Sequence, residues 1–104
     1  MAVVIATVPV SYAWALFLAG RYAEAVSRAQ AALRQQPDYL SALRIVAAGS
    51  ALTDRLTDAR KAIALLHELD PEFRISNIED RDPLRRPENL AKFAEGLRKA
   101  GLPE

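Results

Sequence analysis

The sequence predicts an all-α protein, an α-α superhelix of two helical hairpins with a C-terminal capping helix. Three observations support this prediction. Apolar residues recur at helical spacing in successive segments, turn residues such as Gly20 and Pro37 separate the segments, and residues of the same class return at a fixed period along the chain. Much of the apolar content is alanine and few residues are aromatic, which favours helices packed closely through small side chains over a sheet.

Composition limits the classes of function. The chain has 104 residues, 51% of them hydrophobic, which is enough for one domain with a modest core. With 14 basic and 13 acidic residues the net charge is +1, so no charge excess is available to attract nucleic acid or an anionic membrane. Cysteine is absent, which excludes disulfides and thiolate chemistry. We expect a cytoplasmic protein without a nucleic-acid partner.

The first twenty residues carry no charged side chain and are long enough to span a bilayer. They lack the basic start of a signal peptide, and Thr7, Pro9 and Ser11 dilute their apolar character. A membrane anchor formed by residues 1–20 is therefore an alternative, but we expect a helix buried between neighbours and no membrane role.

The first helix is expected from Val10 to Ala19. Pro9 suits the first turn of a helix, and Gly20 tolerates the left-handed conformation that ends one. Residues 12–18 are apolar almost all round, so this helix must be covered on every side. The rest of the chain can cover only one side, and something else should cover the remainder.

The second helix is expected from Ala23 to Gln35, and Pro37 stops it while Asp38 can cap the next. Its apolar residues share one face: Ala25, Val26, Ala29, Ala32 and Leu33.

The third helix is expected from Tyr39 to Leu52 and the fourth from Thr57 to Leu69. Gly49 lies inside the third at a cost of about 1 kcal/mol relative to alanine, which indicates close approach of a neighbouring backbone.

A period of 34 relates the two halves. It pairs Arg21 with Arg55, Ala25 with Ala59, Pro37 with Pro71, and Tyr39 with Phe73. Two helices per repeat at this period is the tetratricopeptide spacing. The chain resembles a tetratricopeptide repeat protein at the turn glycine, the aromatic, the small packing positions and the final proline: Gly20, Tyr22, Ala25, Ala32 and Pro37. The second unit departs from that pattern, with Asp54 for the glycine and Leu56 for the aromatic. The resemblance implies repeat 1 at about 6–39 and repeat 2 at 40–73.

Residues 74–86 form the expected connector. Charges of both signs alternate there, and Pro83 and Pro87 favour extended or turn conformations. Phe73, Ile75 and Ile78 can tuck under the last hairpin. The capping helix is expected over 87–101, with Pro87 at its first position and the Gly101 region at its end.

The tail carries a second resemblance. It is similar to the C-terminal end of bacterial proteins in which a class III adenylate or guanylate cyclase-type domain precedes tetratricopeptide repeats. The matching residues are Phe73, Ile75, Pro83, Arg86, Pro87, Leu90 and 96–104. This resemblance implies the end of a repeat array and, as an alternative function, a regulatory tail of such a signalling protein. Nothing in the chain supplies the paired metal-binding aspartates of a cyclase.

Candidates for chemistry are few. His67, beside Glu68 and Asp70, complements the negative end of a helix, and as a catalytic base it would need a partner and a pocket. The acidic cluster at 79–82 is interleaved with arginine and is typical of a solvated loop rather than a magnesium site. Zinc ligand sets, phosphate loops and nucleophile motifs are missing. We expect no enzyme, no cofactor and no metal.

In the tetratricopeptide family the first helix of each unit lines a concave groove. By register, the candidate peptide-groove residues here are Val10, Trp14, Phe17, Ser41, Arg44, Ala48 and Ala51. Arg44 is the charged member and would hold a carboxylate or an acidic peptide. The family's lysine and asparagine clamp is not carried over, and the alternative interpretation places Trp14 in the core.

The function predicted from these features is non-catalytic: a protein-protein interaction or scaffolding module that binds a protein or peptide. Solenoids need about three stacked units for stability, and this chain has two. We therefore expect either self-association through the N-terminal apolar residues 3–18 or a place at the C-terminal end of a longer repeat array.

Overall fold

Four helices follow one another as two antiparallel pairs in the computed structural model, which describes residues 10–81, 84 and 86–104. Over these residues the protein is all-helical and contains no strand. The elements are α1 (Val10–Leu18), α2 (Tyr22–Gln35), α3 (Leu40–Leu52), α4 (Leu56–Leu69), the 3-10 turn η1 (Ile75–Asn77), α5 (Ile78–Arg81) and α6 (Pro87–Ala100). The helix limits expected from the sequence are confirmed to within one residue.

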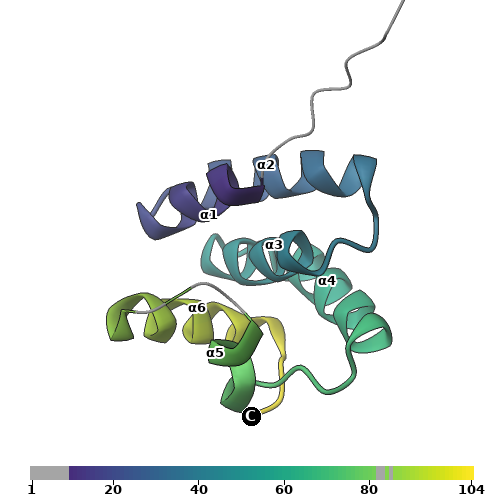
Figure 1. Ribbon diagram of the computed structural model, residues 1–104, viewed down its shortest axis with the longest axis vertical. Helices are drawn as coiled ribbons and strands as arrows, with labels where there is room; N and C mark the ends of the chain where they lie inside the picture. Colours follow the sequence, from purple (N-terminus) through teal and green to yellow (C-terminus); the bar gives the residue numbers. More distant parts are fainter. Residues whose placement is uncertain (1–9, 82–83, 85) are drawn as a thin grey trace, which may run out of the picture.

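The helices lie in successive layers in Figure 1. The α1–α2 pair lies at the top, the α3–α4 pair in the middle, and α6 below. Neighbouring layers pack on each other, with α2 against α3 and α6 against α3. The core runs through all three layers because the alanine-rich faces of α2, α3 and α4 allow close approach.

The turn inside each pair contains a residue in the left-handed region. Gly20 has φ +80°, and Asp54, its counterpart one period later, has φ +61°. The next amide closes the helix in both, from Arg21 N to Leu16 O at 2.9 Å and from Arg55 N to Ser50 O at 2.8 Å. This is the Schellman hydrogen bond that follows a left-handed residue.

The corner after each pair also repeats. The Gln36 amide donates to the carbonyl of Ala32 at 3.0 Å, and the Asp70 amide donates to that of Leu66 at 2.7 Å. Tyr39 and Phe73 then donate to the carbonyls of residues 36 and 70, both at 3.1 Å. The period of the sequence is therefore also a period of backbone hydrogen bonding.

Gly49 lies where α3 meets α2. A β-carbon at this position would stand 2.6 Å from Val26 Cγ2 and 3.4 Å from the carbonyl oxygen of Tyr22. A close approach is therefore confirmed at this glycine, but the nearest atom belongs to the Val26 side chain and not to the backbone.

The connector differs from its prediction. Residues 75–81 form η1 and α5 instead of an extended segment. Asn77 closes the turn, because its Oδ1 accepts from the Arg74 amide at 2.9 Å and its Nδ2 donates to the Glu72 carbonyl at 2.7 Å. Ile75 and Ile78 are both buried. Residues three apart lie on the same side of a helical turn but on opposite sides of an extended strand, so their shared burial requires a helical conformation. Phe73 is buried with them, as expected, while Pro83 lies outside the described residues.

Helix α6 forms where the capping helix was expected. It packs chiefly on α3 and makes fewer contacts with α4. Gly101, with φ +108°, ends it, and the buried Leu102 follows. The tail then returns to η1, where the Ile75 amide donates to the Pro103 carbonyl at 3.0 Å. Helix α6 is thus part of the core.

Candidate functional site

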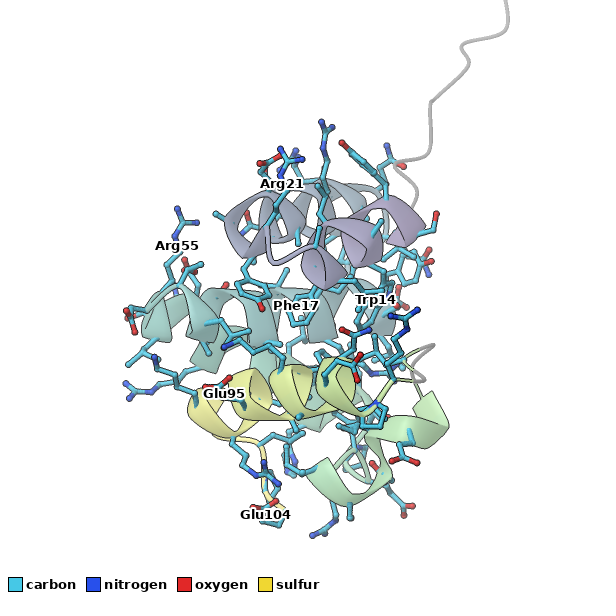
Figure 2. All side chains as sticks on the ribbon, turned by 90° about the vertical axis from the view of Figure 1, so that its left-hand side faces the viewer. Trp14, Phe17, Arg21, Arg55, Glu95 and Glu104 are labelled. Carbon is cyan, nitrogen blue, oxygen red and sulfur yellow. The ribbon has the colours of Figure 1, made fainter. Side chains whose placement is uncertain are left out.

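An aromatic cluster joins α1 to α6. The ring of Phe93 lies 5.2 Å from that of Trp14 and 5.6 Å from that of Phe17, both in edge-to-face geometry. Trp14 also donates from Nε1 to Ser41 Oγ on α3 at 2.8 Å. Figure 2 shows Trp14 and Phe17 pointing from α1 toward α6. These contacts hold three helices together through one tryptophan.

Helix α6 approaches α3 at Gly96. A β-carbon on this glycine would lie 2.7 Å from the carbonyl oxygen of Ala48 and 3.0 Å from its Cα. Only glycine fits here without moving backbone, because the neighbouring atoms are main-chain atoms. The contact sets the distance between the two helices.

Five of the seven residues expected to line an open peptide groove are buried. Trp14 is 5% exposed and Phe17 2%, and Ala48, Ala51 and Arg44 are also buried. Val10 and Ser41 are half-buried. A peptide would reach Ala48 only if α6 moved away, because Gly96 lies against its backbone. The sequence places these residues on the first helix of each pair, but not the helix that covers them.

Arg44 contacts a carboxylate of its own chain instead of one from a partner. Its Nη2 lies 3.6 Å from Asp70 Oδ2, and its guanidinium lies 4.8 Å from the centre of the Phe73 ring. Both charged side chains are largely buried, so each is held in place by the other's charge, and Arg44 is held also by the aromatic face.

The accessible apolar surface of α1 lies on its opposite side. We call the exposed residues Ser11, Tyr12, Ala15, Leu18 and Ala19 the α1 outer face. Tyr12 is 46% exposed and Leu18 45%. The guanidinium of Arg28 lies 5.2 Å from the Tyr12 ring centre. This face contains no charged residue, which is unusual for helix surface in contact with water.

A pocket of about 520 Å³ lies between the second half of α4 and the tail at 101–103. Its wall is mainly apolar, with Ile63, Leu66 and Phe73, and His67 and Glu68 stand at it. His67 is exposed at the end of α4. Within the residues that the structure describes, His, Asp and Glu form no group of three that could hold a metal ion. Of the acidic cluster at 79–82, only the Glu79 side chain is described, and it is exposed.

The sequence did not predict the roles of two residues of this site, Phe93 in the aromatic cluster and Gly96 in the contact with α3. A signal was present: Gly96 lies inside a helix, where it costs about 1 kcal/mol relative to alanine, as Gly49 does in α3. A glycine one turn from a buried phenylalanine indicates a helix that is pressed against another backbone.

No helix in the described part of the chain is long and apolar enough to cross a membrane. Comparisons with models of known protein families, with curated proteins and with solved structures find no match to this chain.

Proposed function

We propose that this protein is a non-catalytic protein-protein interaction module of the tetratricopeptide repeat type. Its two helical hairpins would be repeat units of an α-α superhelix. The observation that carries the proposal is the return of a left-handed turn residue and of the same closing hydrogen bonds after one period, at Gly20 and Asp54 and at Gln36 and Asp70. A cytoplasmic location stays a prediction.

We also propose that the chain forms the C-terminal end of the repeat stack. The position on α4 that corresponds to Val26 of α2 is Arg60, which is exposed. Val26 is the residue by which α2 meets the next hairpin. A charged side chain there opposes a further hairpin, since its guanidinium would lose water in an apolar interface. The tail at 101–103 also lies against α4.

In this proposal the protein binds by presenting a rigid helical surface. The α1 outer face is apolar and accessible, whereas Trp14, Phe17 and Ala48 of the expected groove contact α6. A surface that is already ordered loses little conformational entropy when a partner binds. The apolar area of Tyr12 and Leu18 would supply the affinity.

The test is site-specific photo-crosslinking in the source cells, with a benzophenone amino acid in place of Leu18. The matched control carries it in place of Ala91, an exposed residue of α6. We expect one protein to be crosslinked from position 18 and not from position 91, and the purified pair to bind with an affinity that Leu18→Arg lowers at least tenfold. If no protein is crosslinked from Leu18, nor from the exposed Leu65 and Leu69, the proposal is wrong.

A further inference from the structure

We propose that the α1 outer face binds the second helix of another α-helical hairpin, and that this helix carries alanine where α2 carries Val26. The proposal rests on the proposed repeat function and names the chemistry of the partner. It follows from comparing the two hairpins position by position.

The α1 outer face corresponds, one period later, to the side of α3 that α2 covers. Tyr12 corresponds to Val46, Ala15 to Gly49 and Leu18 to Leu52. Val46 is 6% exposed and Gly49 is buried, with Val26 of α2 directly above it. On the same side of α1, Tyr12, Ala15 and Leu18 are exposed. The chain therefore contains an example of what covers such a face: the second helix of a neighbouring hairpin.

Ala15 limits the size of the partner-helix residue that would lie against it, the counterpart of Val26 on α2. A β-carbon at Gly49 would lie 2.6 Å from Val26 Cγ2, which is too close for two carbon atoms. Ala15 has this β-carbon. A partner helix seated on α1 as α2 is seated on α3 must therefore lack the valine methyl groups, and alanine satisfies this requirement. The remaining residues of the face are uncharged, so the partner helix must also be apolar along this side.

A second copy of this chain does not supply such a helix. Its α2 is already packed against its own α3. Its α4 carries Arg60 at the contact position, with Ala64 and His67 exposed beside it. Stacking α4 on α1 would press the arginine onto Ala15 and remove its charge from water without an acidic partner on the face. The surface is therefore suited to a different hairpin.

The probe is the chain's own first hairpin. Residues 6–39 are duplicated directly before residue 6 of the full chain, so that Ala15 follows inserted position 26 at the same distance along the chain as Gly49 follows Val26. Two versions are made, one with the natural valine at inserted position 26 and one with alanine. Thermal unfolding is followed by circular dichroism for both and for the natural chain.

We expect the alanine version to melt several degrees above both the natural chain and the valine version. Ala15→Arg in the original copy should abolish this rise while leaving the midpoint of the natural chain unchanged, because Ala15 is exposed there. Ala91→Arg, the control at another exposed alanine, should leave the rise intact.

Three results would overturn the inference. The alanine version melts no higher than the natural chain, the valine version melts highest, or the natural chain sediments as a dimer that Ala15→Arg dissociates. The last result would assign the face to a second copy. A partner crosslinked from Leu18 would still support the proposed function in each of these cases. Failure of this inference can therefore be distinguished from failure of the proposed function.

Discussion

Asp54 shows how one residue adapts a repeated turn. It occupies the left-handed position that glycine holds in the first hairpin, and a short polar side chain is among the few that tolerate φ +61°. Its Oδ1 accepts a hydrogen bond from Lys99 Nζ at 2.7 Å, which ties this turn to α6. The hydrogen bond and the charge of Lys99 hold the pKa of Asp54 below its ordinary value.

We predict that Lys99→Met raises the pKa of Asp54 toward that of an unperturbed aspartate, because both causes of the lowering come from Lys99. A carboxyl whose pKa is lowered by folding stabilises the fold at pH values above its unfolded pKa, and this contribution is lost as the pH falls through the folded pKa. The variant should therefore lose less stability than the natural chain on acidification. A carbon-detected NMR titration measures the pKa, and an unchanged Asp54 value in the variant would rule out the Lys99 contact.

Among the elements, α6 is placed by a glycine contact rather than by hairpin geometry. Gly96 meets the backbone of Ala48 on α3, while Phe93 one turn earlier enters the aromatic cluster of α1. Neither neighbour can yield cheaply, because one is main chain and the other is a packed ring. The two contacts therefore set the distance between α6 and α3 and the rotation of α6 about its own axis.

Gly96→Ala tests this placement. Alanine gains about 1 kcal/mol of helix propensity, but moving two packed helices apart costs about 1–3 kcal/mol, so we expect a net loss of stability. Urea unfolding measures the free energy. The control is Ala91→Gly on the exposed side of α6, which should cost only the propensity term of about 0.5–1 kcal/mol. A stabilised Gly96→Ala variant would contradict the close approach.

At the scale of the whole molecule, the three layers share one core. Trp14 touches Phe17 on its own helix, Ser41 on α3 and Phe93 on α6. The layers cannot separate without breaking these contacts. A chain of this size whose elements share a core is expected to unfold in one step.

We predict that Trp14 fluorescence and far-ultraviolet circular dichroism give the same urea midpoint for the natural chain. Phe93→Ala, which empties a fully buried site, should lower the free energy of unfolding by about 3–5 kcal/mol and shift both signals together. If the fluorescence changed at lower urea than the helix content, α6 would be a separable cap rather than part of the core.

The sequence by itself determined the local features. Apolar spacing fixed the limits of α1, α2, α3, α4 and α6, since these depend on residues within a few positions of each other. Turn chemistry indicated the left-handed position at Gly20, and the interior glycine at 49 indicated a close neighbour. In the connector, the alternating charges show no apolar helical face, so the sequence did not predict the helical turn that Asn77 closes.

Only the tertiary structure decided what covers Trp14, Phe17 and Ala48. Their register predicted one shared surface. Apolar spacing shows that a helix face is apolar, but it does not show which element packs against that face. The contact between Gly96 and Ala48 joins residues that are far apart in the chain, so no local spacing encodes it. Helix α6 contacts that surface through Phe93 and Gly96, while Tyr12 and Leu18 on the α1 outer face are exposed, because packing depends on the shape of the whole core.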